Sequence, residues 1–260
     1  MPLDFTAIDF ETANSSSASA CAVGLARVRE GRVVATAGWL IQPPPGHDRF
    51  FELNIGIHGI RPDDVATAPT WVDKLDALTA FVGDDVLVAH NAGFDMRVLR
   101  SACEATDAPC PPYRYICSLQ ASRKTYDLDS YRLPSVAAAA GLLGFAHHDA
   151  TADALACAHI MIDTALRAGA DDIVELAMLL GLRVPQIPTA DARQIGAELD
   201  AVLDAVLDAV PHACGLPLAI LCPAFPAQGR TLIGGVLRVD GIPAAQSAAG
   251  SDPRTPVHES

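Results

Sequence analysis

The sequence predicts an α/β domain, because short apolar runs typical of strands alternate with helical patterns over its first 185 residues. Residues 5–10 form a first buried strand. Two runs with strand-like patterns follow, at 20–28 and 32–41, separated by Arg29-Glu30-Gly31, and they indicate a meander. A further short buried strand is expected at 86–89. A mixed sheet flanked by helices accounts for this order.

Helices are expected where apolar residues recur about once per turn. In residues 93–104, for example, Phe94, Val98 and Leu99 have this spacing. The expected helices are residues 70–81, 93–104, 133–140, an alanine-rich stretch 150–167, and a closing segment 168–182. A loop is expected from 54 to 62, and a proline-rich break at 109–112 leads into a short segment at 113–118.

Length and charge limit the possible functions. The 260 residues, half of them hydrophobic, suffice for one sizeable domain with a smaller appendage. A net charge of −13 and a pI near 4.8 indicate a surface that repels nucleic acid. Binding of a nucleic acid would therefore have to be local, with metal ions offsetting carboxylates.

Cysteine usage points to the cytoplasm. The seven cysteines are odd in number, scattered and without a Cys-x-x-Cys pair, which favours free thiols in a reducing compartment over disulfides or a zinc site. No basic amino-terminal region leads into an apolar stretch, and no run of about 18 apolar residues occurs. We expect a cytoplasmic protein without a membrane segment.

Acidic residues stand where they cost stability. Asp9 and Glu11 end the first apolar strand, and their alternation directs both side chains to one face of the sheet. Asp95 follows the strand at 86–89, and Asp153 lies near the start of the long helix, five positions after His148. Neighbouring carboxylates near a core repel one another, and a divalent cation is their simplest partner.

Taken singly, these acids have ordinary explanations. Asp95 alone would suit a helix start, and Asp153 alone would suit a solvated helix surface. The order of the motifs over about 70 percent of the chain is more specific. The motifs are Asp9-Phe10-Glu11-Thr12, Ile57-His58-Gly59-Ile60, His90-Asn91-Ala92-Gly93-Phe94-Asp95 and His148-Asp149-Ala150-Thr151-Ala152-Asp153-Ala154.

Residues 1–185 with these motifs resemble the DEDDh 3′→5′ exonucleases of the DNA polymerase III epsilon subunit type. The resemblance implies a ribonuclease H-like fold and two ions, Mg²⁺ or Mn²⁺. Asp9 would bridge both ions, Glu11 and Asp153 would help hold the ion that carries the attacking water, Asp95 would support the second ion, and His148 would accept the proton from water. It also implies contacts to the terminal nucleotide from Thr12, Ile57, His58 and Phe94, although Ile57 and Phe94 would equally suit a core.

The expected substrate is a single-stranded DNA 3′ end. RNA trimming is the first alternative, since no residue pattern addresses a 2′-hydroxyl, and a non-catalytic binding module is the second. A DNA polymerase or repair partner is also possible. His147 precedes His148, so the choice of base rests on the His-x4-Asp spacing, and His147 is expected to be an exposed helix-start residue.

The last third suggests a different origin. After a linker at 186–194, residues 195–260 resemble an interior piece of the four-carbon acid sugar kinases, through residues 196–201, 223–231, 239–241 and 252–257. The segment lacks a Gly-rich phosphate loop, so we expect a small α/β appendage without kinase activity. Within it, Asp200, Asp204 and Asp208 line one side of an amphipathic helix that we expect to be solvated.

Overall fold

A computed structural model describes residues 3–188 and two short strands, β6 (Leu232–Ile233) and β7 (Val236–Leu237), which pair antiparallel. The chain divides into two compact units, Met1–Val202 and Leu203–Ser260, and each is considered by itself. The helix expected around Asp204, and the remainder of the expected appendage apart from β6 and β7, lie outside the described residues.

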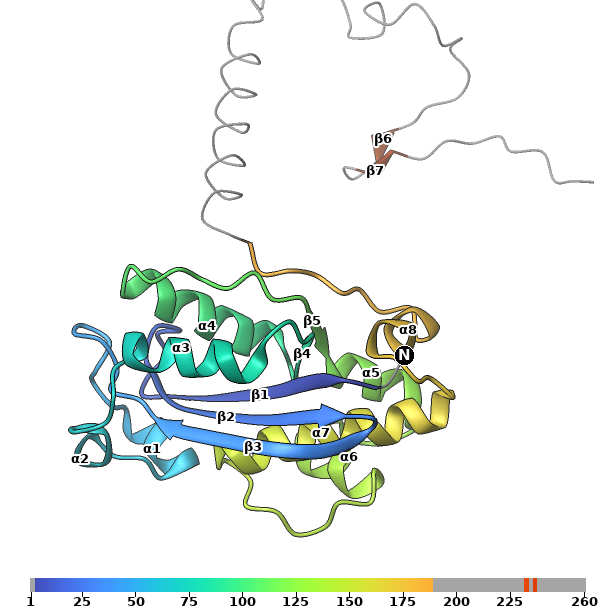
Figure 1. The fold of residues 1–260 in the computed structure, drawn as a ribbon, viewed down its shortest axis with the longest axis horizontal. Helices are drawn as coiled ribbons and strands as arrows, with labels where there is room; N and C mark the ends of the chain where they lie inside the picture. Colours follow the sequence, from blue (N-terminus) through green and yellow to red (C-terminus); the bar gives the residue numbers. More distant parts are fainter. Residues whose placement is uncertain (1–2, 189–231, 234–235, 238–260) are drawn as a thin grey trace, which may run out of the picture. The chain divides into compact units, whose positions relative to one another are not determined.

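The first unit contains the mixed sheet that the sequence predicts (Figure 1). Its order is β3-β2-β1-β4-β5, with antiparallel pairs among the first three strands and parallel pairs from β1 to β4 and from β4 to β5. The strands are β1 (Phe5–Thr12), β2 (Ala20–Arg29), β3 (Arg32–Leu40), β4 (Leu87–Ala89) and β5 (Tyr115–Cys117).

Eight helices belong to the described part of this unit: α1 (Glu52–His58), α2 (Pro62–Val65), α3 (Trp71–Val82), α4 (Gly93–Ala105), α5 (Ser118–Thr125), α6 (Leu133–Ala139), α7 (Ala150–Ala168) and α8 (Ile173–Leu179). Two of the long ones, α3 and α7, begin at capping residues visible in the sequence. Thr70 and Asp73 form a capping box at α3, and the Asp149 side chain accepts from the Ala152 N–H at α7.

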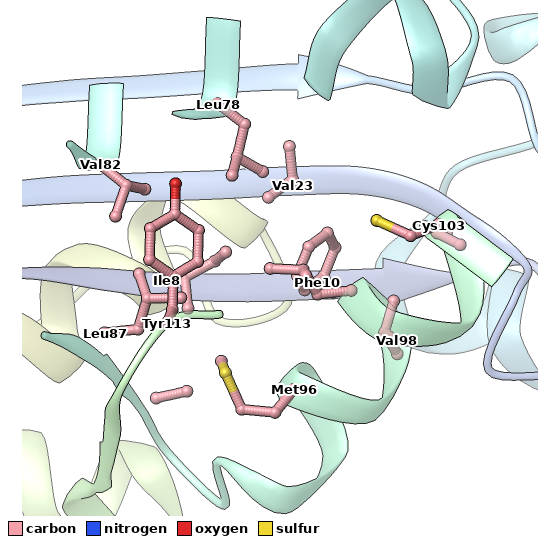
Figure 2. Packing of buried hydrophobic residues seen from close by; sticks show 14 of the residues in the cluster. Ile8, Phe10, Val23, Leu78, Val82, Leu87, Met96, Val98, Cys103 and Tyr113 are labelled. Carbon is pink, nitrogen blue, oxygen red and sulfur yellow. The ribbon is translucent and has the colours of Figure 1, made fainter. Parts of the chain in front are cut away.

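One face of the sheet packs against α3 and α4. Alternate residues of β1 and β2 point into this layer, among them Ile8, Phe10 and Val23, and all are buried (Figure 2). Trp71 from α3 is also fully buried there, with its ring 6.0 Å from that of Phe10. This apolar layer holds the carboxyl-terminal half of β1 against α4.

The other face of the sheet packs against α7, through unusually small side chains. The buried positions of α7 include Ala154 and Ala158, which lie against Phe5 and Ala7 of β1. Since alanine adds little bulk, the helix axis can run close to the sheet. The amino-terminal turn of α7 is thereby brought to the end of β1.

The loop expected at 54–62 is wrong, because residues 52–58 form helix α1. Only Ile55 of this helix is buried, so the segment lacks the apolar repeat of a packed helix. Its conformation depends on distant contacts: the side chains of Asn54 and His58, four residues apart on one face, both contact the backbone carbonyl of Thr12. Gly59, with φ of +77°, ends the helix.

Helix α5 was not expected either. Its buried residues are small, namely Ser118, Ala121 and Ser122, and the buried hydroxyl groups of Ser118 and Ser122 are hydrogen-bonded. A helix that packs through small polar residues has no apolar periodicity to detect. The sequence therefore gives little indication of it.

Residues 185–187 continue the edge of the sheet. The Tyr115 N–H donates to the Pro185 carbonyl, the Ile187 N–H donates to the Tyr113 carbonyl, and the Ile187 side chain is only 2% exposed. The first residues of the expected linker are thus attached to β5 in this structure.

Two further features concern the described residues as a set. None of the helices there is long and apolar enough to cross a membrane. The five cysteines described, which are Cys21, Cys103, Cys110, Cys117 and Cys157, are all free thiols.

Candidate active site

The sheet opens between β1 and β4, and the site lies at this opening. Pairing between the two strands is confined to Thr6 with Leu87 and Ala7 with Val88. Beyond that point β1 no longer pairs with β4, and the Phe10 N–H donates instead to the Asp95 carboxylate at 3.2 Å. Asn91, in the left-handed conformation at φ of +75°, turns the chain from β4 toward α4, whose first turn carries Asp95.

Asp9, Glu11 and Asp153 converge on one point. Each offers a carboxylate oxygen, and these oxygens lie within 4.8 Å of one another. They line an open cavity of about 290 Å³. The complete lining is Asp9, Phe10, Glu11, His90, Arg132, Leu133, His147, His148 and Asp153.

Asp95 is not on the cavity wall. Its side chain is 1% exposed and is held against β1 through Phe10. It nevertheless interacts electrostatically with Asp9. All four predicted acids therefore gather at the end of β1, three of them open to the cavity and one buried behind it.

Burial and repulsion from neighbouring carboxylates raise the pKa values of Asp9, Glu11 and Asp95. Burial, followed by the charges of Asp95, Asp153 and Glu11, raises the pKa of Asp9 well above its ordinary value. Burial likewise raises the pKa of Asp95, and burial with repulsion from Asp153 raises the pKa of Glu11 to about 8. In the absence of a cation, the folded chain therefore favours the protonated forms of Asp9, Glu11 and Asp95.

The donor set fits hard divalent cations. Among the described residues, Asp9, Glu11 and Asp95 form no ion pair with any lysine, arginine or histidine. Closely spaced carboxylate oxygens are the ligands that Mg²⁺ and Mn²⁺ prefer. A cation here would offset the repulsion that raises the three pKa values.

His148 lies just before α7, on a loop, because Asp149 caps the helix and Ala150 is its first residue. Its backbone N–H donates to Asp153 Oδ2 at 3.1 Å, and its side chain lines the cavity. Partial burial, and then the neighbouring His147, lower the pKa of His148 below its usual value. The imidazole is therefore neutral near pH 7 and able to accept a proton.

The expectation for His147 is confirmed in one respect, since the residue is exposed, but it precedes the helix rather than starting it, and its side chain is not turned away from the site. Its Nδ1 lies 3.0 Å from both oxygens of Asp153, and its ring stacks on that of His148 with centroids 3.7 Å apart. The cause is the backbone of His148, whose φ of +72° lies in the left-handed region. This turn folds two consecutive side chains onto the same side.

Thr12, the last residue of β1, is in contact with His58 of α1. The His58 Nε2 donates to the Thr12 carbonyl at 3.2 Å, and the His58 Nδ1 accepts from the Ile60 N–H at 3.0 Å. Asn54 also donates to the Thr12 carbonyl, a role that sequence reasoning missed. Both ring nitrogens of His58 are thus engaged within the protein.

Ile57 and Phe94 are not core residues. Their side chains are 47% and 36% exposed, which excludes the alternative that they fill the interior. A second open cavity of about 300 Å³ adjoins this region and shares His148 with the first. Its lining includes His58, Ile60 and Trp39.

His90 and Arg132 also line the cavity, and sequence reasoning assigned them no role. His90 Nε2 donates to the Tyr131 carbonyl, and its Nδ1 accepts from the Ser118 hydroxyl, both at 2.9 Å. This pair of bonds fixes a neutral tautomer and ties β4 to the loop that precedes Arg132. A lone arginine before Leu133-Pro134 is too common a pattern to identify in advance.

A family model described as "Exonuclease" matches residues 6–161, which is more than half of the chain. The chain belongs to this exonuclease family. The matched region contains all nine candidate residues. A model described as "Sugar-binding N-terminal domain" matches residues 191–260, in keeping with the resemblance to acid sugar kinases.

Three curated relatives of this exonuclease-family chain illustrate its two parts. A protein of Mycobacterium tuberculosis (strain CDC 1551 / Oshkosh), assigned by name as a bifunctional exonuclease/endonuclease, is 32% identical over 168 residues, covering 61% of this chain and 25% of the relative. The PolC-type DNA polymerase III of Thermotoga maritima is 29% identical over 160 residues, covering 61% of this chain and 12% of the relative. The D-threonate kinase of Bordetella bronchiseptica is 51% identical over 43 residues, covering 16% of this chain and 11% of the relative. The chain therefore spans a quarter or less of each.

Solved structures agree on the ribonuclease H-like exonuclease fold. Exonuclease X in complex with 5′ overhanging duplex DNA has a TM-score of 0.54 at 24% identity, covering 68% of this chain and 99% of that one. The nuclease domain of 3′hExo, a DEDDh family member bound to rAMP, has a TM-score of 0.58 at 16% identity, covering 71% and 97%. Exonucleases of the DEDDh type normally use divalent metal ions.

Proposed function

We propose that this chain is a 3′→5′ exonuclease that depends on Mg²⁺ or Mn²⁺ and releases nucleotides from the end of single-stranded DNA. One observation carries the proposal: the oxygens of Asp9, Glu11 and Asp153 lie within 4.8 Å of one another at an open cavity. Four clustered acidic side chains, whose charges basic residues of the protein offset only in part, can bind divalent cations. Such cations stabilise the negative charge that builds up during hydrolysis of a phosphodiester.

Asp9, Glu11, Asp95 and Asp153 would hold the cations. When bound, these ions supply positive charge that activates a water molecule and stabilises the charge of the scissile phosphate. The remaining steps fall to side chains of this chain. His148 accepts the proton of the attacking water, and Asp153 orients His148 through its backbone N–H.

The substrate is held by residues around the two cavities. The exposed Ile57 and Phe94 provide apolar contacts for the terminal nucleotide, and Arg132 provides a positive charge for a phosphate oxygen. Thr12 and His58, whose ring nitrogens are both bonded within the protein, provide further contacts to the terminal nucleotide. With a net charge of −13, binding beyond these contacts is weak, and the enzyme releases its substrate often.

A 5′-labelled oligonucleotide tests this activity directly. With Mg²⁺, the protein is expected to produce a ladder of products that shorten one nucleotide at a time, and a chelator is expected to stop the reaction. Asp9→Asn should abolish cleavage while preserving side-chain shape, and Asp76→Asn, a change of the same kind on the exposed surface of α3, should leave it intact. Cleavage that persists in excess chelator contradicts metal dependence.

Polarity and sugar preference are separate outcomes of the same assay. Immediate release of a labelled mononucleotide from the 5′ end would contradict the 3′→5′ direction. RNA and DNA of one sequence, compared at equal concentration, decide between the leading hypothesis and RNA trimming. The PolC-type relatives make a DNA polymerase a reasonable partner to test by co-purification.

A second activity has its own support, because residues 191–260 match a sugar-binding domain. The segment would bind a four-carbon sugar acid without phosphorylating it, since the sequence has no Gly-rich phosphate loop. Calorimetric titration of the whole protein with D-threonate tests this directly. A protein lacking residues 189–260 is the matched control, and equal heats from both proteins would rule the activity out.

A further inference from the structure

The loop before α7 and the first turn of this helix bring together two imidazoles and a carboxylate that the hydrolytic reaction does not need together. His147, His148 and Asp153 each offer one ligand atom, and these atoms lie within 4.8 Å of one another. The set is distinct from the Asp9, Glu11 and Asp153 set, although the two share Asp153. One set is rich in nitrogen and the other consists of oxygen alone.

The backbone brings the two imidazoles together. Side chains of consecutive residues point about 100° apart in a helix and to opposite faces in a strand. At His148 the left-handed φ of +72°, which is uncommon for a residue other than glycine, stacks the rings 3.7 Å apart instead. The edge of Phe145 packs on His147, with centroids 5.9 Å apart.

The contact between His147 Nδ1 and Asp153 is a hydrogen bond that a cation can replace by binding the nitrogen and the carboxylate together. This nitrogen lies 3.0 Å from both oxygens of Asp153, so a nitrogen donor already faces the carboxylate that serves the first set. The side chain of His147 is about one third exposed, which gives an ion access from solvent.

Ligand type decides which ions prefer each set. Imidazole nitrogens suit Zn²⁺ and the other late transition metals, whereas Mg²⁺ prefers oxygen and binds imidazole poorly. Two histidines and one carboxylate form a common zinc donor set, with water in the fourth position.

We propose that His147, His148 and Asp153 form a second, inhibitory site for a late transition metal such as Zn²⁺. The ion takes up the His148 nitrogen, which hydrolysis needs as the proton acceptor, and the Asp153 carboxylate, which hydrolysis needs to hold Mg²⁺ or Mn²⁺. Zinc binding and hydrolysis therefore exclude each other. The inhibitory effect, though not the binding, rests on the proposed nuclease function.

Binding is measured first, on the full chain and without Mg²⁺. Calorimetric titration with ZnCl₂ and absorption spectra with Co²⁺ report affinity and nitrogen ligation independently of activity. His147→Ala removes one ligand and should weaken Zn²⁺ binding on the order of tenfold or more, since even changes behind a ligand cost that much. His159→Ala, the same change within α7, controls for loss of a histidine and should bind Zn²⁺ like the unmodified protein. Equal affinity in the His147→Ala and unmodified proteins would overturn the proposal.

Inhibition is measured second, at saturating Mg²⁺. Added Zn²⁺ should slow cleavage by the unmodified protein and by His159→Ala at the same concentrations. For His147→Ala, the zinc concentration that halves the cleavage rate should be higher, by the same factor by which this variant loses affinity for Zn²⁺. Equal inhibition of all three proteins would overturn the inhibitory role. Absence of any cleavage with Mg²⁺ would instead refute the nuclease function and leave the binding result standing.

Discussion

Gly24 of β2 lies directly beneath Ala150, the first residue of α7. A Cβ atom on Gly24 would lie 2.0 Å from the Ala150 carbonyl oxygen, a distance that real contacts do not reach. Gly38 of β3 is the register partner of Gly24, and a Cβ atom there would meet the Thr151 hydroxyl at 2.1 Å. Asp9 pairs with Gly24 on the other side. The absence of two side chains thus lets the helix that carries Asp153 approach the strand that carries Asp9.

Gly24→Ala should displace the first turn of α7. We expect a loss of roughly 1–3 kcal/mol in the free energy of unfolding, the usual cost of overpacking, together with a large loss of cleavage. Urea denaturation and the oligonucleotide assay measure the two effects. Gly56→Ala is the matched control, since nothing lies within 4 Å of a Cβ atom there, and it should be neutral or slightly stabilising. Normal activity in Gly24→Ala would show that the close approach is dispensable.

The metal-free protein should become less stable as the pH rises. The pKa of Glu11 is about 8 in the folded chain against an ordinary 4.5, so the folded state holds the proton more tightly than the unfolded state. The resulting stability is fully present below pH 4.5 and is lost as the pH rises through about 8. Asp9 and Asp95, whose pKa values are also raised, act in the same direction.

Urea denaturation in a chelator between pH 5 and 9 tests this dependence. Glu11→Gln should flatten the curve, and saturating Mg²⁺ should raise stability most at high pH because protons and cations compete for the same oxygens. A stability that increases with pH in the chelator would be incompatible with these pKa shifts.

His148→Ala should lower kcat by roughly 10² to 10⁴, the usual contribution of a positioned general base. The affinity for Mg²⁺, obtained from the dependence of rate on metal concentration, should change little because the four carboxylates remain. His159→Ala is the control for histidine loss. If His148→Ala cleaves at the normal rate, another group accepts the proton.

Two truncations test the domain boundary. A protein ending at Pro188 should keep its fold and its cleavage, because every candidate site residue precedes it. A protein ending at Val184 should be less stable by roughly 1.5–3 kcal/mol, because it loses the buried Ile187 side chain and the backbone bonds to β5. Thermal unfolding of the two proteins gives the comparison. Equal stability would show that residues 185–188 are dispensable for the fold and would support the linker expected from residue 186.

The sequence was informative where local pattern determines structure. The strands around Asp9 and the helix after Asp149 follow from apolar periodicity and capping. Helix α1 could not be predicted, because it depends on Asn54 and His58 reaching Thr12, more than 40 residues earlier in the chain. The placement of His147 could not be predicted either, because a left-handed φ at a histidine has no sequence signature. Arg132 becomes a candidate only through its position on the cavity wall.

The small side chains that let α7 lie close to β1 have a consequence for variation along the whole helix. Ala154 and Ala158 sit on the face of α7 that meets the sheet, and a larger residue at either position would tilt a rigid rod of 19 residues. Because Asp153 lies in the first turn of this helix, the tilt would move its carboxylate away from the other site residues. A random mutagenesis screen should therefore recover inactive proteins from positions that touch neither ion nor nucleotide, with their folds intact and their helix out of alignment.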